Sequence, residues 1–146
     1  MTQIATPFTF SKTGLLPQEE MLEITTKKKS LTIGIPKETD ENESRVALTP
    51  QAVELLVTNN YTILYERDAG KGASFSNEKY ADAGATICDS RKMVYEADIV
   101  LKVGPFSLEE IDLLKERQTI ISSFIMNNEA EATIKALIAK KITAIG

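Results

Sequence analysis

Short apolar segments alternate with amphipathic ones from residue 31 to the end of the chain. Six apolar segments are rich in β-branched, aliphatic or aromatic side chains and are bounded by turn-forming residues, which is the pattern of β-strands. The predicted strands are residues 31–35, 61–66, 85–88, 98–103, 119–125 and 142–146. The segment DIVLKV, at 98–103, is almost wholly apolar, so we expect it to be covered on both faces, as strands of parallel sheets are.

Helix signals lie between the predicted strands. Thr49 is a capping residue and Pro50 suits a first helical position, so a helix is predicted from there to about residue 59. Ser107 and Glu110 have the spacing of a capping box, which predicts a helix reaching about residue 115. The inward-facing residues expected in the first helix are Ala52, Val53, Leu55 and Leu56. Further helices are predicted at residues 76–84, 90–96 and 128–141.

This alternation predicts an α/β domain over residues 31–146, built as three layers from a mostly parallel sheet with helices on both faces. Because the last predicted strand ends the sequence, we expect the domain to be truncated from a longer protein. Residues 1–30 differ in composition and are interpreted as an N-terminal arm with one short helix, LLPQEEMLEI. The arm's apolar side chains need cover, either from the domain surface or from an oligomer contact.

Composition narrows the chemistry that the chain can perform. It has no histidine, which excludes Ser-His-Asp and Cys-His catalysis and removes the commonest metal ligand. Its single cysteine, Cys88, cannot form a disulfide or a structural zinc site alone, and we expect no metal. A formal charge of -4 argues against a nucleic-acid or anionic-membrane partner. Without a membrane-length apolar run or a secretory signal pattern, a cytoplasmic location is expected.

Candidate binding residues follow the first predicted strand. This segment contains Lys37, Glu38 and Arg45, and open α/β sheets bind ligands at the carboxyl ends of their strands. Arg45 carries the planar donor fork that matches a carboxylate, although a surface ion pair with Glu41 or Glu43 is the alternative. From the residues alone, Lys37 and Glu38 are expected to be exposed to solvent.

Lys102 lies inside the apolar segment 98–103. A cation in a covered strand must reach solvent, pair with an acid or serve a site. Because Gly104 follows closely and ends the strand, we expect the ammonium group near the carboxyl edge of the sheet. A dinucleotide-binding loop is missing, since Gly70 and Gly72 continue as ASF and lack the third glycine of G-x-G-x-x-G. We interpret that segment as a glycine-rich turn.

Four segments, in order, resemble one known family. They are GIPKETDENESRVALTPQAVELL, ERDAGKGASFSNEKYADAGATI, ADIVLKVGP and LLKERQTIISSFI. The sequence over residues 31–146 resembles the N-terminal domain of the alanine dehydrogenase and pyridine nucleotide transhydrogenase family. The resemblance implies a flavodoxin-like or Rossmann-like substrate domain. It also implies a following domain, absent from this chain, that binds NAD(H) or NADP(H). If the nucleotide is bound there, both the truncation and the missing glycine motif are expected.

The resemblance also implies roles for the candidate residues. In alanine dehydrogenases the arginine of the RVALTP motif holds the carboxylate of pyruvate or alanine, which assigns that role to Arg45. Lys102, Lys37 and Glu38 are then expected near it as further substrate-binding residues.

Two other family residues do not carry over. Alanine dehydrogenases have a K-V-K-E-P pattern and a histidine after the following apolar strand. The second lysine of that pattern and the histidine together polarise the substrate carbonyl and assist proton transfer. In this sequence the position of the second lysine falls near Gly104, and the position of the histidine falls near Met126. Neither replacement donates a proton, so we assign no catalytic residue in this chain and expect the chain alone to be inactive.

The implied activity is the NAD-linked oxidation of L-alanine to pyruvate and ammonia by a complete enzyme. The missing lysine and histidine favour an alternative, hydride transfer between nicotinamide nucleotides as in transhydrogenase α subunits, which need no acid for a substrate carbonyl. A degenerate binding or regulatory module is a third possibility, from another class. The expected partners are a small 2-oxo acid, amino acid or nicotinamide nucleotide, the nucleotide-binding domain, further copies in a homo-oligomer and, for a transhydrogenase, a membrane subunit.

Overall fold

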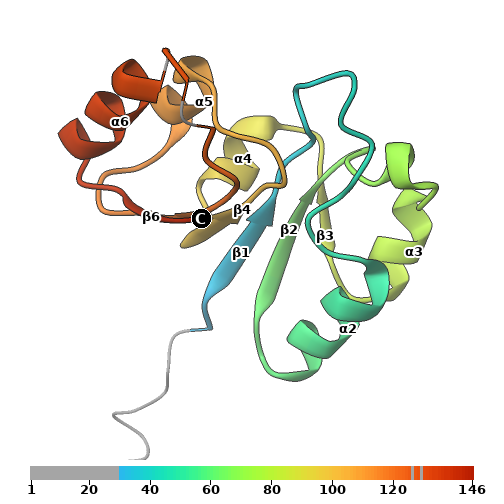
Figure 1. Cartoon of the computed structure of the whole chain (residues 1–146). Coiled ribbons are helices and arrows are strands. Elements are labelled where there is room, and N and C mark those ends of the chain that lie inside the picture. The colour runs from blue at the N-terminus through green and yellow to red at the C-terminus, as the bar shows by residue number, and fades with distance from the viewer. Residues whose placement is uncertain (1–29, 126, 129) are drawn as a thin grey trace, which may run out of the picture.

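A computed structural model of the chain describes residues 30–125, 127–128 and 130–146. Its strands form one sheet in the order β3-β2-β1-β4-β5-β6, and every neighbouring pair is parallel (Figure 1). The strands are β1 (Thr32–Ile35), β2 (Thr62–Glu66), β3 (Thr86–Cys88), β4 (Ile99–Leu101), β5 (Thr119–Ile121) and β6 (Thr143–Ile145). Residues 1–29 of the predicted arm, with its expected helix, and Met126 lie outside the described residues.

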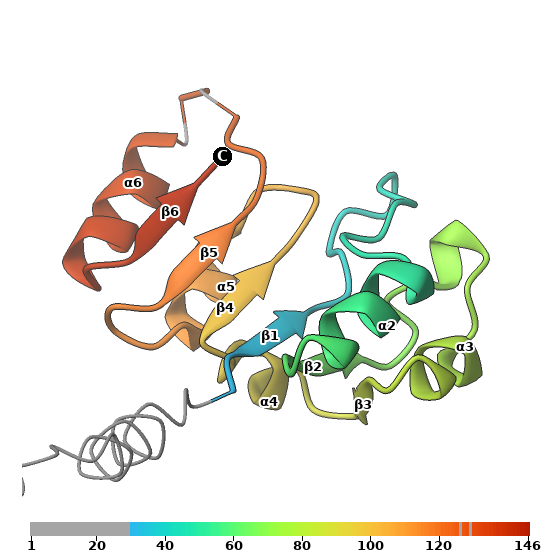
Figure 2. The same cartoon turned by 90° about the horizontal axis from the view of Figure 1, so that it is seen from below.

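Helices cover the sheet from both sides, which confirms the predicted α/β class. The helices are α2 (Pro50–Thr58), α3 (Asn77–Asp82), α4 (Arg91–Tyr95), α5 (Leu108–Leu113) and α6 (Ala130–Ala139), with a 3-10 turn, η2 (Lys71–Ala73). In Figure 2, α2 lies in front of β1 and β2, whereas α4 and α5 lie behind the sheet. None of the helices in the described part of the chain is long and apolar enough to cross a membrane.

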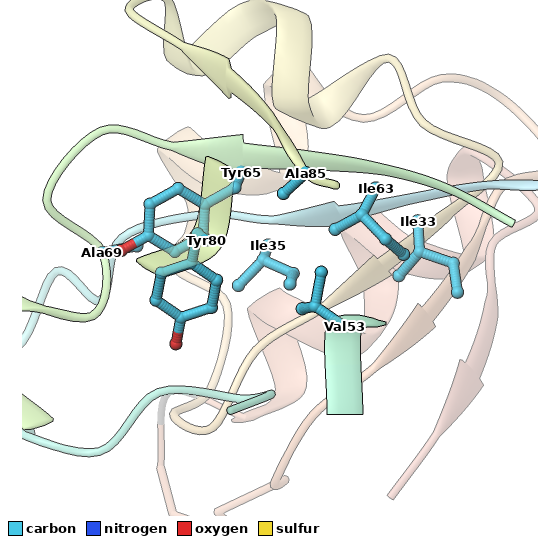
Figure 3. Packing of buried hydrophobic residues seen from close by; sticks show 8 residues of the cluster. All are labelled: Ile33, Ile35, Val53, Ile63, Tyr65, Ala69, Tyr80 and Ala85. Atoms are coloured by element: carbon cyan, nitrogen blue, oxygen red, sulfur yellow. The ribbon is translucent and has the colours of Figure 1, made fainter. Parts of the chain in front are cut away.

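Alternation along β1 decides which helix each side chain meets. Ile33 and Ile35 pack in one cluster with Val53 of α2 (Figure 3). Gly34 faces the other way, because a Cβ at this position would lie 2.2 Å from the carbonyl oxygen of Val94 in α4. Glycine therefore permits the close approach of α4 to the central strand.

The two halves of the sheet are covered unequally. A second cluster joins β4 and β5 to the helices behind them, and its buried residues are Tyr95, Val100, Phe106, Ile111, Leu114, Ile120 and Leu137. On the opposite face of β4, β5 and β6, Figure 2 shows no helix among the described residues. Ile145 of β6 is accordingly 50% exposed. Cover on both faces is thus complete only for the half that contains β1 and β2.

The structure corrects three sequence-based expectations. Strand β4 is shorter than the predicted 98–103, and β5 is shorter than the predicted 119–125, because the chain leaves the sheet early to form loops at its carboxyl edge. Leu55 was expected to face inward but is 65% exposed, since the apolar pattern of α2 is wider than its buried face. The capping box of Ser107 and Glu110 is present, yet α5 ends at Leu113, where the next residue is extended.

Candidate functional site at the carboxyl edge of the sheet

The sheet has a topological switch point between β1 and β4. Strand β1 pairs with β2 on one side and with β4 on the other, so the chain leaves the centre of the sheet in opposite directions. Open α/β sheets bind ligands in the crevice outside the carboxyl ends of such strands. Two segments flank it here, the β1 loop (residues 36–49) and the β4 loop (residues 102–107). All four predicted binding residues lie in these two loops.

Lys102 is buried at the start of the β4 loop, with 3% of its surface exposed. Its Nζ lies 2.9 Å from each carboxylate oxygen of Glu110. It also donates to the carbonyl oxygen of Pro105 at 3.1 Å and to Oγ1 of Thr39 at 3.4 Å, and it lies 5.4 Å from the centre of the Phe106 ring. We considered that Lys102 could reach solvent, pair with an acid or serve a site. In the structure it pairs with an acid, Glu110.

Glu38 bridges the two loops. Its carboxylate accepts hydrogen bonds from the backbone N–H groups of Val103, at 2.7 Å, and Gly104, at 3.2 Å. One of its oxygens is 3.7 Å from Nζ of Lys102, and its side chain is only 7% exposed. The expectation of solvent exposure was therefore wrong for Glu38, because the β1 loop folds over the crevice and the carboxylate satisfies two backbone donors. We call Glu38, Lys102 and Glu110 the buried charge cluster.

Glu110 completes this cluster from the first turn of α5. It accepts hydrogen bonds from the hydroxyl of Tyr95, at 2.8 Å, and from the backbone N–H of Ser107, also at 2.8 Å. Burial acts to raise the pKa of Glu110, but the hydrogen bonds from Ser107 and Lys102 outweigh it, and the pKa is lowered overall. The sequence identified Glu110 only as a helix cap. Its second role was missed, although a buried lysine eight residues earlier was a signal that an acid was needed.

Arg45 is in the opposite situation, with a side chain that is 74% exposed. Its guanidinium binds both carboxylate oxygens of Glu43, at 2.8 Å through Nε and 2.6 Å through Nη2. These hydrogen bonds lower the pKa of Glu43 to about 2. The surface ion pair considered as an alternative is therefore present with Glu43. The pair uses two of the five N–H donors of a guanidinium, and its exposure leaves the fork accessible.

Lys37 has a fixed backbone and an exposed side chain. Its N–H donates to the carboxylate of Glu66 at 2.7 Å, and its carbonyl oxygen accepts from Arg91 at 3.4 Å. Arg91 in turn lies 3.2 Å from Glu66. Within the described part of the chain, the ammonium group of Lys37 has neither a hydrogen bond nor an ion pair. The exposure expected for Lys37 is confirmed, and the side chain is free to meet a ligand.

A cleft of about 630 Å³ opens between the β1 loop and the loop that follows β2. Three cationic side chains line it, those of Lys37, Lys71 and Arg91. The acidic residues that line it are Glu38, Asp40, Glu41, Glu43 and Asp68. The cleft does not include Arg45 or Lys102, so the structure brings Lys37 and Glu38 together in it and leaves the other two outside. Because acids outnumber bases, the cleft suits a small ligand carrying both charges better than a polyanion.

No group of acidic or cysteine side chains in the described residues is placed to hold a metal ion. The loop between Gly70 and Gly72 forms η2, a single 3-10 turn, and not the start of a long helix. A Cβ at Gly72 would lie 3.0 Å from the backbone of Ser44, so this glycine permits close packing of the two loops that form the cleft. The glycine-rich segment is therefore explained by packing.

A parallel α/β sheet with charged loops at its switch point defines a class of ligand-binding domains, and comparisons with known proteins narrow the class. The family described as "Alanine dehydrogenase/PNT, N-terminal domain" matches residues 34–146. The chain is 38% identical over 115 residues to an alanine dehydrogenase of Staphylococcus haemolyticus, covering 79% of this chain and 31% of that protein. It is also 38% identical over 115 residues to NAD(P) transhydrogenase subunit alpha of Haemophilus influenzae, covering 79% of this chain and 22% of the relative.

Solved structures agree with the sequence comparisons. An L-alanine dehydrogenase superimposes with a TM-score of 0.75 at 33% identity, covering 80% of this chain and 32% of the other. A transhydrogenase from Sinorhizobium meliloti superimposes with a TM-score of 0.70 at 30% identity, covering 77% and 33% of the two chains. The chain therefore belongs to the alanine dehydrogenase/transhydrogenase family and corresponds to its N-terminal domain. It spans about a third or less of the length of these relatives.

Proposed function

We propose that this chain is the substrate-side domain of an NAD-linked oxidoreductase that interconverts L-alanine with pyruvate and ammonia. Membership of a family whose named relatives are oxidoreductases supports the class of reaction. The observation that carries the proposal is the exposed side chain of Arg45, within the RVALTP segment of the loop that follows β1. A guanidinium fork that already binds one carboxylate in a bidentate manner can bind that of pyruvate or alanine.

The chain's own residues bind and orient the substrate in this proposal. Arg45 holds the carboxylate, which fixes the direction in which the reacting carbon points. Lys37 and Glu38 line the mixed-charge cleft beside the β1 loop and supply both signs of charge to a small zwitterion. The described residues contain no dinucleotide loop, so NAD(H) or NADP(H), which supplies hydride chemistry when bound, is assigned to a following domain.

A transhydrogenase-like reaction is the second candidate. It is favoured by Gly104, which stands near the position of a family lysine and has no side chain. A Cβ there would lie 3.0 Å from a carboxylate oxygen of Glu38, so the place next to the backbone is already taken by an acid. Without a proton donor at this position, hydride transfer between two nicotinamides is chemically simpler than reduction of a carbonyl.

Assays of the full-length gene product test the proposal. We expect alanine-dependent reduction of NAD, and no hydride transfer from NADH to an NADP analogue. The reverse result would support the transhydrogenase reaction. Activity in neither assay would contradict both reactions and favour a binding or regulatory module. Residues 1–146 alone should show no turnover of NADH, pyruvate and ammonia, and steady turnover would contradict the assignment of the cofactor to another domain.

The remaining expectations concern location and assembly. We propose a cytoplasmic enzyme that forms a homo-oligomer. We also propose that it binds no nucleic acid, and the formal charge of -4 supports this last point. The second candidate would add a membrane subunit as a partner. Size measurement of the full-length product in solution checks the oligomer, and a monomer would contradict it.

A further inference from the structure

Lys102 was expected to bind substrate, but all of its hydrogen-bond donors already have partners within the protein. An ammonium group has three donors, and Nζ has acceptors in both oxygens of Glu110 and in the carbonyl of Pro105, with Thr39 as a fourth neighbour. The side chains of Lys102 and Glu110 are 1% and 3% exposed. A ligand would have to displace an acid from a buried pair, which leaves an uncompensated charge and is strongly unfavourable.

The buried charge cluster connects three segments that are distant in the sequence. Glu38 and Thr39 belong to the β1 loop, whereas Lys102 opens the β4 loop and Glu110 begins α5. Glu38 also holds the backbone of the β4 loop through the N–H of Val103. The cluster therefore fixes the first part of the β1 loop against the neighbouring strand.

The other end of the β1 loop is fixed separately. The hydroxyl of Tyr80, a fully buried residue of α3, donates to the carbonyl oxygen of Leu48 at 2.8 Å. Between the two attachments, residues 40–47 contain Arg45. The backbone of Ser44 also packs against Gly72, and Val46 packs against the core. The attachment by the buried charge cluster is therefore one of several that set the position of Arg45, although no group of the cluster is within hydrogen-bonding distance of it.

We propose that Lys102 is a positioning residue, which holds the β1 loop through Glu38 and Thr39 so that Arg45 is presented to the substrate carboxylate. This inference rests on the proposed function, in which Arg45 holds that carboxylate. Lys102 acts through the loop and does not contact the substrate. Its loss therefore weakens substrate binding only while Arg45 is present.

A double-mutant cycle in the full-length enzyme tests this role. Lys102→Met keeps the length of the side chain and removes the charge. We expect it to raise the KM for pyruvate about tenfold in the wild-type background and less than about twofold in Arg45→Ala, because coupled residues are non-additive. Lys140→Met is the matched control, since Lys140 also donates to three acceptors, the carbonyls of Ile111, Asp112 and Leu114 at the end of α5, none of which belongs to the β1 loop. It should lower Tm and leave KM unchanged.

Three results would overturn the inference. A full additional rise in KM when Lys102→Met is placed on Arg45→Ala would make Lys102 a direct ligand. A lower Tm with unchanged KM, as in the Lys140→Met control, would make it a purely structural residue. If Lys102→Met does not fold, Thr39→Val removes the hydroxyl that accepts a hydrogen bond from Lys102 at nearly constant size, and additivity of that variant with Arg45→Ala would overturn the inference instead.

The failure of the proposed function gives a different result. In that case the full-length product either does not turn over pyruvate or has a KM for pyruvate that Arg45→Ala leaves unchanged. The positioning of the loop is then measured by hydrogen exchange of the Val103 and Gly104 amides, which donate to Glu38. Exchange at least about tenfold faster in Lys102→Met than in Lys140→Met would retain the role of Lys102 in holding the loops. Equal exchange in the two variants would overturn that role as well.

Discussion

The carboxyl edge of the sheet has two ion pairs with short distances between their charged groups, and the two pairs differ in burial and in their other hydrogen bonds. Lys102 and Glu110 are 2.9 Å apart with side chains 1% and 3% exposed, whereas Arg45 and Glu43 are 2.6 Å apart with side chains 74% and 15% exposed. In the first pair, tyrosine, serine and proline groups supply further hydrogen bonds. In the second, the arginine donors beyond the pair face solvent.

The difference in burial indicates that Lys102 stabilises the fold, whereas Arg45 is accessible to a ligand. A buried pair is costly to break because its partner is left without solvent or counter-charge. An exposed pair contributes little to stability and exchanges its partner easily. Burial therefore decides which cation at the edge is available to a substrate, and residue type does not.

The largest effect is expected from Glu110→Ala. It removes the nearer counter-charge of Lys102 and leaves the buried ammonium group with only Glu38, at 3.7 Å, as a counter-charge, which destabilises the fold by about 3–5 kcal/mol. Glu109→Ala is the matched control, because Glu109 is the adjacent, exposed residue of the same helix turn. Urea unfolding of the two variants measures the difference. Equal free energies of unfolding would show that the buried pair has no special role.

A smaller effect is expected from Tyr80→Phe, which leaves the carbonyl oxygen of Leu48 without its buried donor. The loss of one neutral hydrogen bond destabilises the fold by about 1 kcal/mol. Tyr61→Phe, in a half-buried tyrosine, serves as the control and should have little effect. If thermal unfolding shows the same Tm for both variants, the second attachment of the β1 loop contributes nothing to stability.

The smallest expected effect is a change in the pH dependence of stability. The pKa of Glu110 is lowered in the fold from its ordinary value of 4.5. Its contribution is therefore fully present above pH 4.5 and is lost as the pH falls through the lowered pKa. Unfolding midpoints of Glu110→Gln measured from neutral pH downward should depend less on pH below 4.5 than those of the wild type. An unchanged slope would exclude Glu110 as the titrating group.

Local sequence signals predicted the fold well. The capping box of Ser107 and Glu110 and the Thr49-Pro50 helix start are confirmed, because both depend on residues within one turn. The alternation of strands and helices was enough to predict the parallel sheet. The lengths of β4 and β5 were overestimated, since apolar residues continue into loops that the sheet does not include.

The chemistry of the site was harder to predict, because partners are chosen by tertiary structure. Nothing near Lys102 in the sequence says that Glu38, more than sixty residues earlier, lies 3.7 Å from its ammonium group. Glu38 was therefore expected in solvent. Arg45 was easier, since its partner, Glu43, is two residues away. The substrate-binding roles of Arg45, Lys37 and Glu38 stay predictions, and for Lys102 the expected substrate-binding role is replaced by the proposed positioning role.

The KM of Arg45→Ala for pyruvate, measured in the full-length enzyme, tests the account most directly. Loss of a charged hydrogen-bonding partner should raise this KM about 10- to 100-fold. The Tm should not change measurably, because the side chain is 74% exposed and an exposed ion pair contributes little to stability. An unchanged KM would contradict the account and reduce Arg45 to one half of a surface ion pair.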